Sequence, residues 1–325
     1  MMRGKYIVQL GDMVNLENKK SSLTPKALRG SVFVPMLTPF DNNGELDEKA
    51  VGRLIDHILN GGCQGIIASG TTGEAVSMSR KMRIRLANIC AKSIKGRGVF
   101  LFGIGDDSLE QSVDIGKAAI KAGADALLAH LPSYYPITEP QMESWFIELA
   151  DRIDAPIFLY NIPQTTGLSL SLAVVKRLSH HPNIVGIKDS DANEGRQIKL
   201  GRMFSKRNDF AYLCGSGALV NSAVRNGAVG FTPSLGNLKP ELVVELMKCH
   251  STGDEEGCDT ILNSLNELAT VLDGGHGMSH SLCALKAAAS RMRLCRSNML
   301  KPLLGLSKSE MTQLGKALKT IGFEQ

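Results

Sequence analysis

Short apolar runs alternate with amphipathic stretches along most of the chain, beginning near Ser31. None of these runs exceeds seven residues, and they are flanked by Gly, Pro or Asp, a pattern typical of strands buried on both faces of a sheet. The sequence therefore predicts eight strands: Val32–Leu37, Gly65–Ser69, Val99–Gly103, Ala126–Leu131, Pro156–Asn161, Ile184–Lys188, Phe210–Cys214 and Ala228–Phe231.

The stretches between these runs have helical periodicity. In Asp47–Asn60 the apolar residues recur on one face, and Gly61 follows as a stop signal. Ser108–Lys121 is a second example, ending before Gly123. Eight strands that alternate with helices predict a (β/α)8 TIM barrel, an α/β fold. Alternation alone does not prove closure, so a doubly wound open sheet is the alternative.

Three segments are expected along the chain. Residues 1–28 are polar and aperiodic, and they are expected to form an N-terminal extension. The barrel is expected over residues 29–238. After Lys239 no further strand is predicted, and residues 239–325 are expected to contain the last barrel helix and appended C-terminal helices.

Composition narrows the class of protein. Of the 325 residues, 43% are hydrophobic and 21% are charged, which excludes wholesale disorder. Aromatic residues are 5% of the chain and the net charge of +5 is dispersed, so nucleic acid is not an expected partner. The longest uncharged run, Ala155–Val175, is interrupted by Pro156 and Pro163, and we expect no membrane helix. Seven cysteines without a C-x-x-C pair indicate no disulfide framework and favour a cytoplasmic protein.

Lys188 is the first candidate for chemistry. Active sites of (β/α)8 barrels lie at the carboxyl ends of the strands, and Lys188 ends the run Ile184–Lys188, directly before Asp189. A charged amine there is costly unless it is paired or loses its proton. An unprotonated lysine is a nucleophile that forms a Schiff base with a carbonyl compound. The alternative is a structural lysine paired with Asp189.

Two further strand ends carry polar groups. Tyr160 lies at the end of the run Pro156–Asn161, where its phenol can transfer protons or simply pack. Gly65–Ser69 continues into Gly70-Thr71-Thr72-Gly73-Glu74, whose glycines allow successive N–H groups to converge on a carboxylate. The alternative for this segment is a plain strand-to-helix turn capped by Thr and Glu74.

Two other patterns are given little weight. His276 and His280 are four residues apart, but no Glu follows the first histidine as in a metalloprotease helix. Gly103-x-Gly105 lacks the third glycine of a dinucleotide-binding loop and follows the third strand. We therefore expect no metal and no nucleotide cofactor.

Taken together, these stretches resemble the dihydrodipicolinate synthase/N-acetylneuraminate lyase family of class I, Schiff-base aldolases. The resemblance is carried by G-T-T-G-E, by Tyr160–Gly167 (Y-N-I-P-x-x-T-G) and by Gly186–Asp189 (G-I-K-D), and it extends from about Gly30 to Ser307. It implies a lyase in which Lys188 forms an imine with pyruvate or another 2-oxo acid. Tyr160 would then transfer protons.

The resemblance also implies roles for other residues. Thr71 and Thr72, beside Gly70, would hold the substrate carboxylate and relay protons. Tyr135 matches a relay residue that reaches a neighbouring subunit's site in synthase-type members. Gly215 and Ser216 would line the pocket. Members are commonly homotetramers built as dimers of dimers, so we expect a homo-oligomer.

The acceptor is where the sequence departs from the best-known members. Lysine-pathway synthases carry an Arg at the position of Thr165, and a neutral hydroxyl cannot form a bidentate clamp on a carboxylate. Sialic acid lyases carry an acidic pair where this chain has Gly215-Ser216. The remaining pocket, with Thr165, Thr166, Ser190 and Ser216, favours a 2-keto-3-deoxy sugar acid aldolase or dehydratase. A dihydrodipicolinate synthase acting on aspartate semialdehyde and a non-catalytic barrel that binds a 2-oxo acid are the alternatives.

Overall fold

The computed structural model describes residues 20–323 and contains a closed barrel of eight parallel strands, each paired with its neighbours in chain order. This confirms the predicted (β/α)8 barrel and excludes the open sheet. The strands are β1 (Ser31–Pro35), β2 (Gly65–Ala68), β3 (Val99–Gly103), β4 (Ala126–His130), β5 (Ile157–Asn161), β6 (Ile184–Asp189), β7 (Ala211–Cys214) and β8 (Gly230–Phe231).

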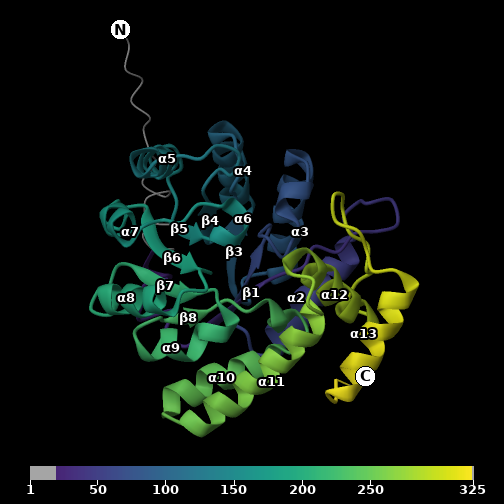
Figure 1. Ribbon diagram of the computed structural model, residues 1–325. Helices are drawn as coiled ribbons and strands as arrows, with labels where there is room; N and C mark the ends of the chain where they lie inside the picture. The colour runs from purple at the N-terminus through teal and green to yellow at the C-terminus, as the bar shows by residue number, and fades with distance from the viewer. Residues whose placement is uncertain (1–19, 324–325) are drawn as a thin grey trace.

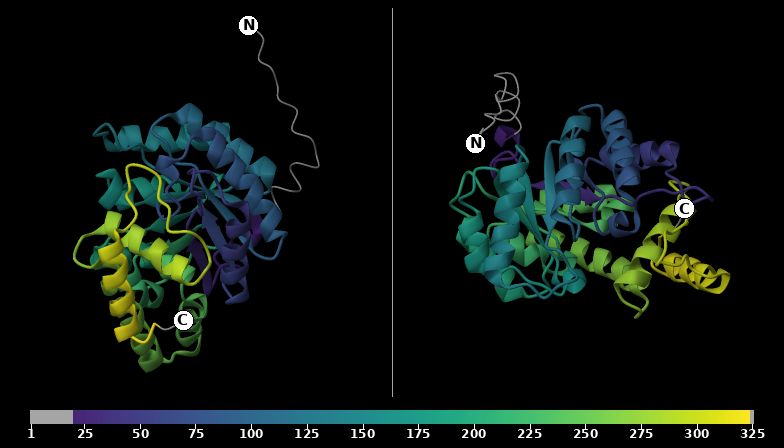
Figure 2. Two further views of the ribbon diagram at one scale, coloured as in Figure 1. Left: turned by 90° about the vertical axis from the view of Figure 1, so that its right-hand side faces the viewer. Right: turned by 90° about the horizontal axis from the view of Figure 1, so that it is seen from above.

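Helices surround this barrel, and a further group of helices from the C-terminal part of the chain lies together on one side of it (Figures 1 and 2). The barrel helices are α2 (Glu48–Asn60), α3 (Arg80–Ile94), α4 (Leu109–Ala122), α5 (Glu139–Arg152), α6 (Pro163–Thr166), α7 (Leu172–Leu178), α8 (Glu194–Phe204), α9 (Val220–Arg225) and α10 (Pro240–Thr252). They are followed by α11 (Glu255–Asp273), α12 (Met278–Arg291) and α13 (Lys308–Thr320). Short 3-10 turns occur at η1 (Ala75–Ser77), η2 (Gly217–Leu219) and η3 (Ser234–Asn237).

Local sequence explains where the helices begin and end. Asp47 caps α2 by accepting a hydrogen bond from the Ala50 amide at 3.0 Å, and Ser108 caps α4 in the same way. Gly123 ends α4 with φ of 123°, a conformation that only glycine adopts easily. The predicted helices Asp47–Asn60 and Ser108–Lys121 are therefore confirmed to within one residue.

Apolar side chains form two packed layers. The interior of the barrel is filled by large side chains from alternate strand positions, including Phe33, Leu128 and Phe158. A second, larger layer lies between the outer wall of the barrel and the helices. Leu23 and Leu28, which fall in the predicted extension, are buried in the interior layer. The end of that extension thus closes the amino end of the barrel, while residues 1–19 lie outside the described residues.

The C-terminal helices complete the molecule. Within the described residues no strand follows β8, as the sequence predicts. α10 packs against β1 and α2, while α11 and α12 pack against each other and extend along the barrel opening. No helix within residues 20–323 is both long enough and apolar enough to cross a membrane.

Candidate active site

Lys188 and Tyr160 meet at the carboxyl ends of two adjacent strands. The register of the sheet pairs Tyr160 on β5 with Lys188 on β6, and pairs His130 on β4 with Tyr160. Lys188 and Tyr160 are only 4% and 5% exposed, and the Lys188 Nζ lies 4.2 Å from the centroid of the Tyr160 ring. An amine and a phenol are therefore held in contact at the barrel mouth, with little of either side chain exposed.

Asp189 does not neutralise Lys188. Because successive strand residues point to opposite faces, the Asp189 carboxylate lies on the outer side of the barrel. There it accepts hydrogen bonds from Arg196 at 2.7 and 2.9 Å and from Gln197 at 2.8 Å. Within the described residues Lys188 forms no ion pair, so the structural alternative of a Lys188–Asp189 pair is not observed.

The segment after β2 presents unused hydrogen-bond donors to the same space. The amides of Thr71 and Thr72 donate to no acceptor within the described residues, although their neighbours Gly73, Glu74 and Ala75 close the turn by bonding back to Gly70 and Thr71. The Thr71 hydroxyl lies 3.4 Å from the Tyr160 hydroxyl. Two free N–H groups and two hydroxyls beside the amine form a site that suits a carboxylate.

Two strained residues border this segment, and buried cations hold both. Ser69 and Glu74 have φ of 55° and 56°, in the left-handed region that non-glycine residues rarely occupy. Arg83 on α3 donates to the Ser69 hydroxyl at 3.0 Å and to the carbonyls of Gly103 and Gly105. Burial lowers the pKa of Arg83 to about 10.

Glu74 is held by a residue more than two hundred positions away in the chain. Its carboxylate pairs with Lys286 of α12 and accepts a hydrogen bond from the Leu300 amide at 2.8 Å. Both side chains of this pair are fully buried, and burial lowers the pKa of Lys286 while Glu74 opposes that shift. Glu74 therefore does not cap a helix with its side chain; it joins the turn after β2 to the C-terminal helices.

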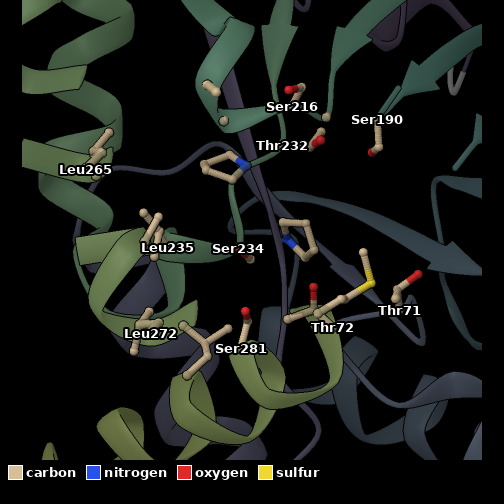
Figure 3. Close-up of a pocket in the computed structure, with 18 of the residues that line it drawn as sticks. Thr71, Thr72, Ser190, Ser216, Thr232, Ser234, Leu235, Leu265, Leu272 and Ser281 are labelled. Carbon is tan, nitrogen blue, oxygen red and sulfur yellow. The ribbon is translucent and has the colours of Figure 1, made fainter. Parts of the chain in front are cut away.

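A cavity of about 490 Å³ opens above the lysine. Figure 3 shows that the hydroxyl groups of Ser190, Ser216 and Thr232 gather on one side of it, with Leu235, Leu265 and Leu272 on the other. The leucines of α11 and η3 form an apolar wall along this space.

A second cavity of about 620 Å³ shares Thr71 and Tyr160 with the first. It extends toward the ends of β3 and β4, where Asp106, Asp107, His130 and Ser133 line it. Tyr160 thus stands between two lobes of one site.

The predicted site residues divide between these lobes. Lys188, Ser190, Gly215 and Ser216 line the first, Gly70 and Thr165 line the second, and Thr71 and Tyr160 line both; Thr72 lines the first. Gly215 is needed for the approach of neighbouring groups, because a Cβ there would lie 2.1 Å from the Ser190 Oγ. The Thr165 hydroxyl donates to the Ile162 carbonyl at 3.2 Å.

Tyr135 is the predicted residue that the chain does not bring to its own site. It lies in the loop after β4, is 70% exposed, and packs edge-on against Tyr134 with ring centroids 5.0 Å apart. It lines neither lobe within the described residues. Its assignment to a neighbouring subunit's site therefore stays a prediction.

His276 and His280 are close, with ring centroids 4.8 Å apart, but His276 precedes α12, whereas His280 lies within it.

Sequence reasoning missed His130, Arg83, Lys286 and the leucine wall. His130 ends the fourth strand and satisfies the same strand-end criterion that found Lys188, so it could have been found. The other residues lie on helices and carry no local signal.

Relatives of this chain share both the fold and its length. A family model described as the dihydrodipicolinate synthetase family matches residues 28–321. The 4-hydroxy-tetrahydrodipicolinate synthase of Bartonella quintana is 30% identical over 296 residues, covering 91% of this chain and 98% of the relative.

Two solved structures superpose closely. The dihydrodipicolinate synthase from Bacteroides thetaiotaomicron has a TM-score of 0.85 at 29% identity, covering 89% of this chain and 98% of that one. The chloride-inhibited dihydrodipicolinate synthase from Acinetobacter baumannii, complexed with pyruvate, has a TM-score of 0.83 at 28% identity and covers 91% and 100% of the two chains.

A closed parallel barrel with a lysine and a tyrosine at the ends of neighbouring strands defines a class I aldolase type of lyase. The chain belongs to the dihydrodipicolinate synthetase family.

Proposed function

We propose that this lyase forms a covalent imine between Lys188 and the C2 carbonyl of pyruvate or a related 2-oxo acid. The observation that carries the proposal is the position of the Lys188 amine, which is buried without an ion-pair partner in the described residues and lies against the ring of Tyr160. The free Thr71 and Thr72 amides beside it suit the carboxylate that a 2-oxo acid carries next to its ketone.

Cleavage then proceeds through the imine. The free amine of Lys188 adds to C2, and Tyr160 donates its proton to the carbinolamine hydroxyl, which leaves as water to give a protonated imine and a phenolate. When the C3–C4 bond breaks, its electron pair moves toward the imine nitrogen to form an enamine, and the C4 hydroxyl gives up its proton to Tyr160, with Thr71 in the relay. Protonation at C3 and hydrolysis release pyruvate, and condensation is the reverse.

Loss of a C4 hydroxyl as water could use the same imine. A dehydratase would therefore share the mechanism as far as formation of this imine. No separate cofactor or metal is required, because the imine accepts the electrons.

The favoured substrate class is a 2-keto-3-deoxy sugar acid. Hydroxyl-bearing side chains line both lobes, which suits a hydroxylated acceptor. Among the described residues that line the two cavities, the cationic side chains are Lys188 and Arg83, and Arg83 is already bonded to Ser69, Gly103 and Gly105. A second substrate carboxylate would therefore find no bidentate partner.

The second candidate is 4-hydroxy-tetrahydrodipicolinate synthesis from pyruvate and aspartate semialdehyde. It is favoured by the name of relatives such as the Bartonella quintana protein. Thr165 is the observation against it, since this side chain offers a hydroxyl already donated to the Ile162 carbonyl. A coupled assay with aspartate semialdehyde separates the two: ordinary turnover there, without pyruvate release from 2-keto-3-deoxy acids, would establish the synthase instead.

The imine is tested by borohydride reduction in the presence of pyruvate. We expect N-(1-carboxyethyl)lysine at position 188 by peptide mass spectrometry, and no adduct in Lys188→Arg. Lys206→Arg, an exposed matched control, should be labelled like the unmodified chain. Absence of the adduct from the unmodified chain would remove the enzymatic mechanism. Unchanged pyruvate binding by Lys188→Ala, without turnover of any substrate by the unmodified chain, would favour a non-catalytic barrel.

We further infer a homotetramer, in which Tyr135 reaches the site of a neighbouring copy. Support comes from the exposure of Tyr134 and Tyr135 at 77% and 70%, which leaves two aromatic rings uncovered at the carboxyl side of β4. A monodisperse monomer by light scattering would contradict this role of Tyr135.

The seven cysteines are all free thiols, which supports a reducing, cytoplasmic location.

A further inference from the structure

His130 presents an unused hydrogen-bond acceptor to the second lobe of the site. Its Nδ1 lies 2.7 Å from the Leu131 carbonyl oxygen, which can only accept, so the proton of the neutral ring is on Nδ1. The Nε2 atom therefore carries a lone pair, and it makes no hydrogen bond within the described residues. Since His130 lines the lobe of about 620 Å³, this lone pair is available to a ligand.

The surroundings of the ring favour this neutral state. Burial lowers the pKa of His130, and the nearby Arg83 lowers it further; the hydrogen bond to Leu131 and the carboxylates of Asp107 and Asp106 act in the opposite direction. The ring also lies edge-on to Tyr160, with centroids 6.5 Å apart. His130 is thus fixed beside the residue that separates the two lobes.

Gly105 creates the space that the ring occupies. A Cβ at this position would lie 2.3 Å from the Cδ2 and Nε2 atoms of His130, closer than any real contact. The carbonyl of Gly105 is held in turn by Arg83 at 3.2 Å. The glycine pair Gly103-x-Gly105 is explained here by a close approach of the backbone to Ser69 and to the imidazole.

The direction from Lys188 to His130 defines what the acceptor would meet. β4 and β6 flank β5, so His130 and Lys188 lie on opposite sides of Tyr160. A 2-oxo acid substrate joined to Lys188 through C2 can therefore extend past Tyr160. Its aldehyde-derived half, which begins at C4, would then lie in the second lobe. There the matching partner for Nε2 is a hydroxyl donor.

We propose that His130 is a specificity-determining residue that accepts a hydrogen bond from a hydroxyl group on the aldehyde-derived half of the substrate. The inference rests on the proposed aldolase function and adds the substrate class that this lobe selects: hydroxylated aldehydes in preference to their deoxy counterparts. A site built to pair with a hydroxyl discriminates strongly against an analogue that lacks it.

The test compares glyceraldehyde with propanal as acceptors in condensation with pyruvate. The unmodified enzyme should prefer glyceraldehyde in kcat/KM by about tenfold or more. His130→Phe, which keeps a ring without an acceptor, should lose that preference by reducing glyceraldehyde turnover while leaving propanal within about threefold. His130→Gln, which restores an acceptor oxygen, should recover part of the preference. The exposed His276→Ala is the matched control and should behave as the unmodified enzyme.

Borohydride trapping of pyruvate is measured on every variant, and it separates this inference from the proposed function. Trapping that persists in His130→Phe shows a folded site with an intact imine. Failure of trapping in the unmodified chain removes the proposed function, and this inference with it. With trapping intact, an equal loss for both aldehydes in His130→Phe, or no preference in the unmodified enzyme, would overturn the role of His130 alone.

A second variant tests the same point without changing the histidine. Gly105→Ala introduces the Cβ that overlaps the ring, so it should reduce the preference for glyceraldehyde as His130→Phe does. In His130→Ala the imidazole ring no longer occupies the space beside Gly105. Adding Gly105→Ala to this variant should therefore cause little further loss of the preference for glyceraldehyde. Additive losses in this pair would show that Gly105 acts independently of His130 and would contradict the proposed arrangement.

Discussion

Lys188 and Asp189 are neighbours in the chain, yet their side chains point to opposite sides of the barrel wall. The pleat of β6 turns the amine inward, toward Tyr160, and the carboxylate outward, toward Arg196 and Gln197. The carboxylate that could have neutralised the lysine is thereby occupied elsewhere. One residue of strand register decides whether this lysine is an ion-pair partner or can act as the proposed nucleophile.

Tyr160→Phe tests the phenol separately from the ring. The aromatic contact with Lys188 is kept, but the hydroxyl beside Thr71, which we propose transfers protons, is lost. We expect pyruvate release to fall by about 10²- to 10⁴-fold, with the borohydride adduct at Lys188 still detectable. Steady-state assays and mass spectrometry measure the two effects.

Tyr212→Phe is the matched control. That phenol donates to Gln197 on the outer side of β7, away from both lobes, so turnover should change by less than about threefold and the loss should be limited to about 1 kcal/mol of stability. Equal losses of turnover in the two variants would contradict the role given to Tyr160.

At the scale of elements, the turn between β2 and η1 depends on two helices that follow it in the chain, one immediately and the other some two hundred residues later. Ser69 and Glu74 both occupy left-handed conformations, each costing on the order of 1–3 kcal/mol. Arg83 of α3 and Lys286 of α12 bind their side chains and keep the Thr71 and Thr72 amides directed at the cavity. A flexible turn would lose this alignment of donors.

Lys286→Met should destabilise the protein strongly. It removes the cation but leaves the Glu74 carboxylate fully buried, which costs about 3–5 kcal/mol in the free energy of unfolding. The double variant Glu74→Gln/Lys286→Met should recover most of this loss, because the amide oxygen can still accept from the Leu300 amide. Urea unfolding measures both. A loss below about 1 kcal/mol in the single variant would show that the pair is not needed.

At the scale of the whole molecule, the active site is assembled from both halves of the chain. The barrel contributes Lys188, Tyr160 and the turn after β2, whereas α11 and α12 contribute an apolar wall and the Glu74 partner. The C-terminal helices are therefore part of the catalytic unit and not an accessory to a finished barrel.

Half-buried histidines predict how the stability of this assembly depends on pH. Burial is the main cause of lowered pKa values for His57, His130 and His250. In the unfolded chain these groups take up protons near pH 6.5, before the folded chain does, so acidification favours unfolding. We expect the free energy of unfolding to decrease from pH 7.5 to 5.5, measured by urea titration.

His57→Gln should reduce that pH dependence, since the Nε2 of His57 is buried without a hydrogen-bond partner. A stability that is constant or rises toward pH 5.5 would contradict the assignment. Carboxylates with lowered pKa values, such as Asp209, would act only at more acidic pH, because the stability that they contribute is lost as the pH falls from the ordinary carboxyl range toward their folded-state pKa.

Much of the architecture was predictable from local pattern. Each of the eight apolar runs overlaps one strand; Gly65–Ser69 corresponds to β2 at Gly65–Ala68, for example. Strands buried on both faces must be continuously apolar, and such runs can be recognised in the amino-acid sequence alone. Lys188, Tyr160 and Thr71 were identifiable for the same reason, because a polar group directly after such a run stands out.

What local pattern could not supply is the partnership between distant segments. Glu74 and Lys286 are 212 residues apart, and nothing near either residue identifies the other. The division of the site into two lobes, the leucine wall of α11 and the orientation of the His130 ring depend on how helices and loops pack on the closed barrel. Periodicity and turn chemistry depend on a few neighbouring residues, and they were sufficient to predict the strands and their order. Pairing of buried charges and the shape of a cavity depend on side-chain volumes from the entire chain, and only the folded structure brings these together.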